Sequence, residues 1–128
     1  MTVHTILVVD DSPTERFFIT DLLSRRGYAV LTADNGADAL ARIRAERPSL
    51  VVMDVVMPGA SGFQVTRALS RDPATQSIPV ILCTSKANPT DVIWGLRQGA
   101  REYVTKPVDG AALLAKIAEL VHADCAPT

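Results

Sequence analysis

The stretch LVVMDVVM (residues 50–57) places a single carboxylate, Asp54, among seven apolar side chains, and Pro58 follows directly. A short, unbroken apolar run rich in β-branched residues is typical of a parallel strand that helices cover on both faces. Burying an unpaired carboxylate is expensive, so an acid at the end of such a strand needs a compensating partner. We therefore predict a buried strand over residues 50–53 and a functional reason for Asp54.

Four other segments repeat the strand pattern along the chain. TILVV (5–9) and PVILC (79–83) are as apolar as residues 50–53, which indicates central strands. AVLTA (29–33) and EYVTK (102–106) are interrupted by polar side chains, which favours positions at the edges of the sheet. If the three apolar strands are central, the first and third of the five strands lie side by side.

Helix start signals stand between these strands. SPTE (12–15) and NPTD (88–91) fit the capping-box pattern with a proline at the first helical position, and Gly27 and Gly99 stand where helices should end. The predicted N-terminal caps are Ser12, Asn35, Ser61, Asn88 and Asp109. Five strand–helix units in strict alternation predict a doubly wound α/β fold with a five-stranded parallel sheet, one domain over residues 1–128.

Composition excludes several classes of protein. The 128 residues include 13 basic and 14 acidic side chains, a formal charge of −1 that argues against a nucleic-acid partner. No apolar run is long enough for membrane insertion, and the carboxylates after residues 5–9 argue against a signal peptide. Cys83 and Cys125 form no metal-binding pattern and are interpreted as reduced thiols of a cytoplasmic protein.

The predicted fold brings polar side chains from distant segments to one edge of the sheet. Sites in open parallel sheets form beyond the carboxyl ends of the strands, where the strand order reverses. The side chains expected there are Asp10 and Asp11 from the first strand, Asp54 from the third, Thr84 from the fourth and Lys106 from the fifth. Taken singly, acids at a helix start, a surface lysine and a threonine in a strand each have an ordinary explanation. Asp54 is the hardest to explain in that way.

The motifs VVDDS (8–12), MDVVMPG (53–59), CTS (83–85) and TKP (105–107) together resemble the receiver domain of bacterial two-component response regulators. The resemblance extends from about Val3 to His122 and implies the flavodoxin-like strand order 2-1-3-4-5. The segments DDSPTE and WGLRQGAREYVTKPVD are similar, more narrowly, to stand-alone regulators of type IV pilus, or twitching-motility, systems. No output domain is expected in this chain.

The resemblance implies a phosphoacceptor chemistry. Asp54 would be the phosphorylated nucleophile, Lys106 would pair with Asp54 and then with the phosphoryl group, and Thr84 would donate its hydroxyl. Mg²⁺ would be the cofactor, an ion that prefers oxygen ligands. Its implied protein ligands are Asp11, Asp54, the backbone carbonyl of Val56 and, through water, Asp10. In receivers the peptide bond corresponding to Lys106–Pro107 is typically cis.

Val56 and Lys86 depart from the best-known chemotaxis receivers, which carry Asn and Glu at these positions beside the pocket. Since both positions lie where the hydrolytic water passes, rapid self-dephosphorylation is not expected from the motifs.

The resemblance also implies a signalling role rather than turnover of a substrate. The partners would be a CheA-like histidine kinase and a downstream motility or signalling protein, and the regulator itself would be a monomer. It would signal by protein contact or act as a sink for phosphate. Thr84 and Tyr103 correspond to the paired switch residues of receivers. On the helix after residues 88–91, Val92, Ile93 and Leu96 are predicted to be buried, leaving Trp94 and Arg97 as an output surface. Packing of Trp94 against the last helix is the alternative.

Two other functions use similar features. A flavin carrier shares the strand order, but its phosphate would be repelled by the acidic pair Asp10–Asp11. A hydrolase of the haloacid dehalogenase type also uses strand-end aspartates and is retained as the alternative. Its nucleophile, however, lies on the first strand in an acid-x-acid motif, whereas Asp54 follows the third.

Overall fold

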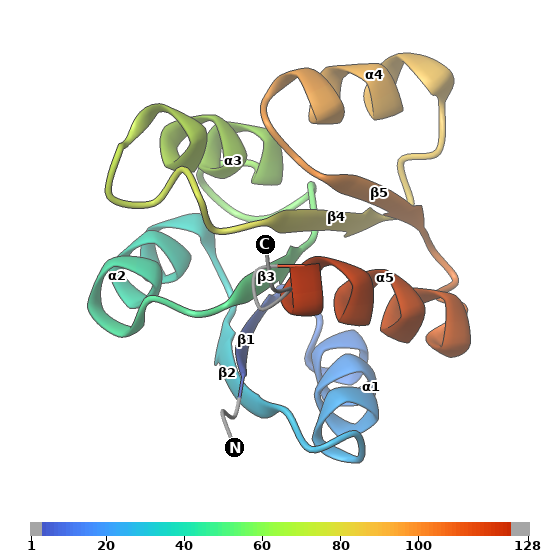
Figure 1. Ribbon diagram of the computed structural model, residues 1–128. Coiled ribbons are helices and arrows are strands. Elements are labelled where there is room, and N and C mark those ends of the chain that lie inside the picture. Colours follow the sequence, from blue (N-terminus) through green and yellow to red (C-terminus); the bar gives the residue numbers. More distant parts are fainter. Residues whose placement is uncertain (1–3, 124–128) are drawn as a thin grey trace.

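Five parallel strands form one sheet in the order β2-β1-β3-β4-β5 (Figure 1). The structure is a computed structural model that describes residues 4–123. The strands are β1 (Thr5–Val9), β2 (Ala29–Ala33), β3 (Leu50–Met53), β4 (Val80–Thr84) and β5 (Glu102–Thr105). The predicted strands are therefore confirmed, except that β4 starts and ends one residue later and β5 ends one residue earlier than expected. The two polar strands lie at the edges.

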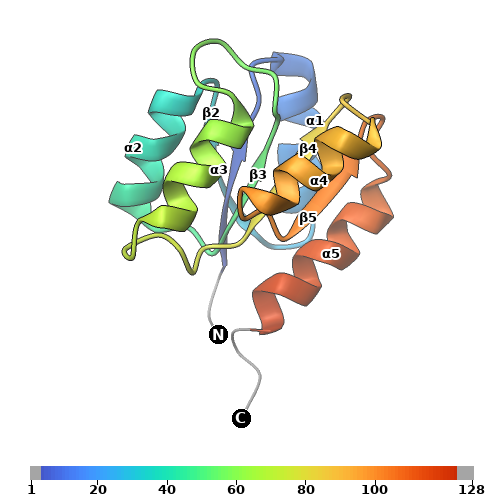
Figure 2. The same ribbon diagram turned by 90° about the horizontal axis from the view of Figure 1, so that it is seen from above.

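Helices cover both faces of this sheet (Figures 1 and 2). The helices α1 (Pro13–Ser24) and α5 (Gly110–Ala123) lie on one face. The other face carries α2 (Gly36–Glu46), α3 (Gly62–Arg71) and α4 (Pro89–Arg97). Among the helices of the described part of the chain, none has the length and apolar character needed to cross a membrane.

Alternate residues of each central strand supply two hydrophobic cores. In β1, Leu7 and Val9 point into the core beneath α2 and α3, whereas Ile6 and Val8 point into the core beneath α1 and α5. Both cores need apolar side chains, which explains why the central strands are unbroken apolar runs. Cys83 belongs to the second core, where burial raises the pKa of its thiol to about 12 and packing accounts for it. Cys125 lies outside the described residues.

The predicted caps form to different extents. Ser61 and Gln64 make a complete capping box at the start of α3, and the side chains of Asn35 and Asp109 accept hydrogen bonds from backbone N–H groups of α2 and α5. At α1 only half of the box exists, because Ser12 accepts from the Glu15 N–H while the Glu15 side chain points elsewhere. Asn88 occupies the cap position of α4 but makes no side-chain cap bond, so the second predicted box is wrong.

The expected buried stripe of α4 is also wrong. Ile93 and Leu96 are 54% and 45% exposed, and the residue that α4 buries is Gly95. A Cβ on Gly95 would stand 2.9 Å from both Leu82 Cδ1 and Tyr103 Cδ2, closer than side chains pack. The helix therefore approaches the sheet through its glycine, and its large apolar side chains turn outward on either side of that contact.

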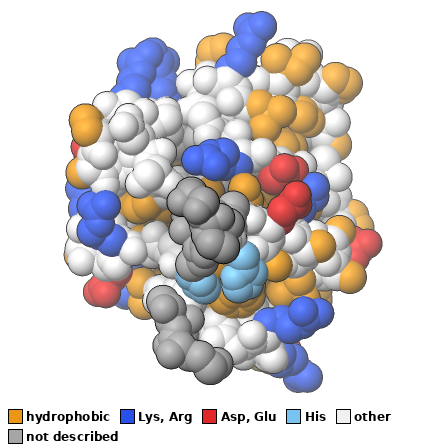
Figure 3. Space-filling view, in the orientation of Figure 1, with side chains coloured by type: hydrophobic (Ala, Val, Ile, Leu, Met, Phe, Trp, Pro, Cys, Tyr) orange, Lys and Arg blue, Asp and Glu red, His pale blue; other side chains and the backbone are white. Residues whose placement is uncertain are grey.

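Two histidines contact each other at the end of the sheet where the strands begin. His4, just before β1, and His122, near the end of α5, meet edge to face with ring centroids 5.6 Å apart. Both rings lie together on the face shown in Figure 3. His4 Nδ1 also lies 3.3 Å from Ser49 Oγ, before β3. This contact links α5 to the amino ends of the two central strands.

The start of α3 is pressed against the backbone that follows β3. The Gly62 N–H donates to the Val55 carbonyl over 2.9 Å. A Cβ on Gly62 would overlap the Asp54 carbonyl oxygen and stand 2.9 Å from Val55 Cα. Since these are backbone atoms, no side-chain rotation can relieve the clash. Gly62 thus fixes how closely α3 approaches the segment that carries Asp54.

Gly62→Ala should lower the free energy of unfolding by roughly 1–3 kcal/mol, because the added methyl group forces backbone to move. Gly110→Ala is the matched control, since its Cβ would meet only side-chain atoms of Leu22, the nearest at 3.2 Å. Urea denaturation of both variants provides the measurement. Equal stability of the two variants would contradict the role assigned to Gly62.

Candidate functional site

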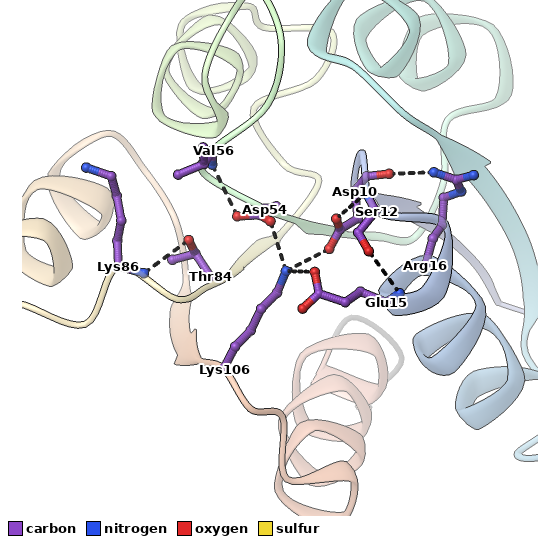
Figure 4. Close-up of polar contacts among 9 residues, drawn as sticks. All are labelled: Asp10, Ser12, Glu15, Arg16, Asp54, Val56, Thr84, Lys86 and Lys106. Carbon is purple, nitrogen blue, oxygen red and sulfur yellow. Dashed lines mark hydrogen bonds and ion pairs between the residues drawn. The ribbon is translucent and has the colours of Figure 1, made fainter.

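The ammonium group of Lys106 lies at the centre of three carboxylates (Figure 4). Lys106 Nζ donates to Asp10 Oδ2 at 2.9 Å, to Asp54 Oδ2 at 2.9 Å and to Glu15 Oε2 at 2.7 Å. The acids come from the ends of β1 and β3 and from the first turn of α1, and Lys106 follows β5. The fold therefore brings three segments distant in sequence to one point: residues 10–15, Asp54 and Lys106. The Lys106–Pro107 peptide bond is cis, as expected.

Asp10 and Asp54 are held by the backbone as well as by Lys106. Asp10 Oδ1 accepts from the Ser12 N–H at 2.9 Å, and Asp54 Oδ1 accepts from the Val56 N–H at 3.1 Å. Their side chains are 3% and 10% exposed, and that of Lys106 is 10% exposed. One oxygen of each acid thus accepts a hydrogen bond from a backbone amide and the other accepts one from the ammonium group. These bonds offset the free-energy cost of burying the carboxylates.

The electrostatics of Lys106 follow from this arrangement. Burial alone lowers the pKa of the lysine, but hydrogen bonds to Asp10, Asp54 and Glu15 outweigh burial and raise its pKa well above the usual range. Lys106 therefore stays charged at any physiological pH. Because its folded pKa is raised, its contribution to stability is complete below the unfolded pKa and is lost only as the pH rises through the folded one.

The remaining predicted site residues surround this cluster. Asp11 lies next to Asp10 but its side chain is exposed and stands outside the group of Asp10, Glu15 and Asp54. Thr84 is fully buried at the end of β4, and its Oγ1 accepts from the Lys86 N–H at 3.3 Å. The Val56 side chain faces solvent. The structure thus brings Asp10, Asp54 and Lys106 into contact and leaves Asp11 at the rim.

Glu15 is the site residue that the sequence did not reveal. As the N3 residue of a capping-box pattern it had a sufficient structural explanation, in which its carboxylate accepts a hydrogen bond from the Ser12 N–H. That N–H is taken by Asp10, and the Glu15 carboxylate reaches Lys106 instead. No local signal in the sequence distinguishes these two outcomes, since the choice depends on Lys106, which is 91 residues away.

The donor set suits a small, hard cation. Asp10, Glu15 and Asp54 each offer a carboxylate oxygen, and these oxygens lie within 4.8 Å of one another. Three carboxylates around one ammonium leave a net negative charge, before the neighbouring Asp11 is counted. Oxygen ligands of this kind are what Mg²⁺ prefers, so the residues present fit the ion.

Two residues expected to form a switch meet at the backbone of Lys86. The Tyr103 hydroxyl donates to the Lys86 carbonyl at 2.7 Å, and Thr84 accepts from the N–H of the same residue. Burial, reinforced by Asp91 and Asp54, raises the pKa of Tyr103, so the hydroxyl keeps its proton. The loop after β4 is therefore held from both sides, by the residue that ends β4 and by the aromatic ring of β5.

Trp94 and Arg97 lie on the outer side of α4. Trp94 is 49% exposed, and with Arg97 it lines a hollow bounded by Arg67, Ser70, Arg71 and Gln98, that is, between α3 and α4. The alternative in which Trp94 packs against α5 is therefore not what the structure shows. Its ring is available at the surface.

Comparison with known proteins identifies the class to which this fold and site belong. The sequence model of the response regulator receiver domain matches residues 6–118. The chain belongs to this family, whose members are phosphoacceptor signalling proteins that bind Mg²⁺ through acidic residues. The structure of the chemotaxis response regulator CheY4 of Vibrio cholerae has a TM-score of 0.86 at 29% identity, covering 93% of this chain and 99% of CheY4. The BeF3-activated DrrB receiver domain gives 0.85 at 30% identity, covering 94% and 99%.

Among individual relatives, the chain is similar to the protein PilH of Pseudomonas aeruginosa, with 54% identity over 112 residues that cover 88% of this chain and 93% of PilH. The transcriptional regulatory protein AfsQ1 of Streptomyces coelicolor is 41% identical, but the chain spans only 49% of its length. The narrower resemblance to pilus-type regulators is thus confirmed as a similarity to PilH. The hydrolase alternative finds no support in these comparisons.

Replacing Lys106 with Met should lower the free energy of unfolding by about 3–5 kcal/mol at pH 7, because two buried carboxylates lose their counter-ion. The same difference should persist at pH 9, since the raised pKa of Lys106 places its titration higher still. Urea denaturation at both pH values measures it. Lys116→Met is the control, because its half-exposed pair with Glu102 should contribute at most about 1 kcal/mol. A loss no larger than the control's would contradict the central role of Lys106.

Proposed function

We propose that this protein accepts a phosphoryl group on Asp54 from a CheA-like histidine kinase. The contact of Asp54 with Lys106 and the adjoining Asp10 carries the proposal. It supports a site where a carboxylate nucleophile, a fixed positive charge and further acids for a cation stand together. Family membership supports the same chemistry, because receivers are phosphoacceptors. The protein would catalyse only its own phosphorylation and dephosphorylation.

The transfer is a displacement at phosphorus. One Asp54 oxygen forms the new O–P bond while the P–N bond to the donor histidine breaks, and the electron pair leaves with the imidazole nitrogen. Little covalent chemistry remains for the protein, so catalysis is positioning and charge stabilisation. Lys106 neutralises charge on one phosphoryl oxygen, and the Thr84 hydroxyl donates to another. Val56 N–H holds the second Asp54 oxygen and so fixes the direction of the nucleophile.

Mg²⁺ would be held by Asp11, Asp54 and the backbone carbonyl of Val56, with Asp10 acting through water. When bound, the ion would neutralise charge between the acids and the incoming phosphoryl group. Asp11 is exposed and directly follows Asp10 in the chain.

The signal would leave through protein contact at α4. The hydrogen bonds that join Thr84 and Tyr103 to Lys86 support these residues as the switch pair, because a Thr84 hydroxyl engaged by the phosphoryl group acts on the same loop as Tyr103. The exposed Trp94 and Arg97 support α4 as the output surface. By similarity to PilH we propose a monomeric cytoplasmic regulator in control of twitching motility, either contacting a motility protein or draining phosphate.

Asp54→Asn should abolish phosphorylation while leaving stability equal or slightly higher, because the amide cannot attack phosphorus and one charge is removed from a group of acids. Incorporation of radiolabel from a phosphorylated kinase, or from acetyl phosphate with Mg²⁺, provides the measurement. Asp34→Asn, an exposed acid that follows β2, is the control and should be labelled like wild type. Labelling of Asp54→Asn at the wild-type rate would exclude Asp54 as the acceptor.

Trp94→Ala should weaken binding of the phosphorylated protein to its partner by roughly 2 kcal/mol, because a large rigid side chain at an interface centre contributes strongly. Its melting temperature and phosphorylation kinetics should stay near wild type, since the ring is 49% exposed. Phe17→Ala is the control, an aromatic residue that is 72% exposed on α1. Titration calorimetry on the phosphorylated proteins decides. Equal affinities for Trp94→Ala and Phe17→Ala would remove Trp94 from the output surface.

A further inference from the structure

The Glu15 carboxylate occupies a position that helix capping does not require. In α3 the equivalent residue is Gln64, whose Oε1 accepts a hydrogen bond from the Ser61 N–H and completes the box. In α1 the Ser12 N–H already donates to Asp10, so Glu15 has no such role and extends to Lys106 at 2.7 Å. This is the shortest of the three bonds that Lys106 makes.

Lys106 has no free donor while Glu15 is in place. An ammonium group has three N–H bonds, and the three carboxylates accept one each. To donate to a phosphoryl oxygen, Lys106 must give up one of these partners. Asp10 is 3% exposed and is also held by Ser12, and Asp54 carries the phosphoryl group itself. Glu15, with a side chain that is 45% exposed, is the partner most easily released into water.

Electrostatic repulsion also favours release of Glu15 from Lys106. The cluster oxygens of Glu15 and Asp54 lie within 4.8 Å of one another, so a phosphoryl group on Asp54 would bring further negative charge close to Glu15. Like charges at such a distance repel by an amount that matters even in a well-solvated site. Beside Glu15 and Lys106 the surface forms a hollow of about 320 Å³, also lined by Thr14, Phe18, Ile19, Pro107 and Val108. A displaced side chain therefore has room to move.

We propose that Glu15 is an internal competitor of the phosphoryl group. Its carboxylate competes with a phosphoryl oxygen on Asp54 for the ammonium group of Lys106, and phosphorylation weakens or displaces the Glu15 contact. The inference rests on the proposed function of Asp54 and deepens it. Glu15 is a positioning residue in this scheme: it keeps Lys106 fixed over the site in the unphosphorylated protein and opposes the phosphorylated state. In this scheme Mg²⁺ is held by Asp11, Asp54 and the Val56 carbonyl, and Glu15 binds Lys106 instead.

Equilibrium binding of beryllofluoride, a phosphoryl mimic that does not turn over, tests this competition. Wild type, Glu15→Gln and the control Glu119→Gln, an exposed α5 acid that loses the same charge, are titrated in saturating Mg²⁺ and followed by NMR. Removing the competitor should tighten beryllofluoride binding by roughly fivefold or more in Glu15→Gln, as expected for one nearby charge after solvent screening. Glu119→Gln should bind like wild type. Mg²⁺ affinity, titrated separately without beryllofluoride, should fall little in Glu15→Gln.

The sign of the change separates the competing explanations. Tighter beryllofluoride binding by Glu15→Gln alone supports the competitor. Weaker binding of both Mg²⁺ and beryllofluoride would make Glu15 part of the cation site and overturn the proposal, and unchanged binding would overturn it as well. Failure of wild type to bind beryllofluoride would instead refute the proposed function of Asp54. Glu15→Ala, which removes the charge without the amide, repeats the test if Glu15→Gln is poorly folded.

Discussion

The structure depends on one lysine that allows acids to be buried at the ends of two central strands. Asp10 and Asp54 follow β1 and β3, two of the three interior strands of the sheet, and their side chains are almost inaccessible to water. Backbone amides satisfy one oxygen of each acid, and among residues 4–123 only Lys106 supplies an opposite charge. Since Lys106 arrives from β5, the ion pairs also tie an edge of the sheet to its centre. The same contact is therefore structural in the resting protein and chemical in the proposed reaction.

Because the Lys106 contacts serve both stability and the proposed reaction, the site carries a net negative charge. Three carboxylates in contact with one ammonium group leave an excess of negative charge, which favours a bound cation and resists an incoming phosphoryl group. A structural ion pair would need one acid for one base. The additional acids have no stabilising purpose that a single pair could not serve, and their presence is what points to function.

The strands and the contact of Asp10 and Asp54 with Lys106 could be predicted from the sequence, because both follow from the hydrophobic pattern of short segments. Apolar runs such as residues 5–9 and 50–53 can only be central strands, and parallel strands bring Asp10, Asp54 and Lys106 to one edge. Two predictions fail where a tertiary contact overrides a local pattern. Glu15 satisfies the capping pattern but is captured by Lys106, and α4 packs through Gly95 rather than through Ile93 and Leu96. In each case the deciding partner lies elsewhere in the chain.

The packing of Gly95 also bears on how a signal could travel. At Gly95 the backbone of α4 packs directly against the ring of Tyr103, so movement of that ring would shift the helix. The Tyr103 hydroxyl is bonded to Lys86, whose N–H is bonded to Thr84, so three consecutive contacts connect the end of β4 to α4. A larger residue at position 95 would separate helix from ring and loosen this connection. The glycine that made the buried face of α4 hard to predict thus has a physical role, because it places α4 against the Tyr103 ring and so connects the helix to the end of β4.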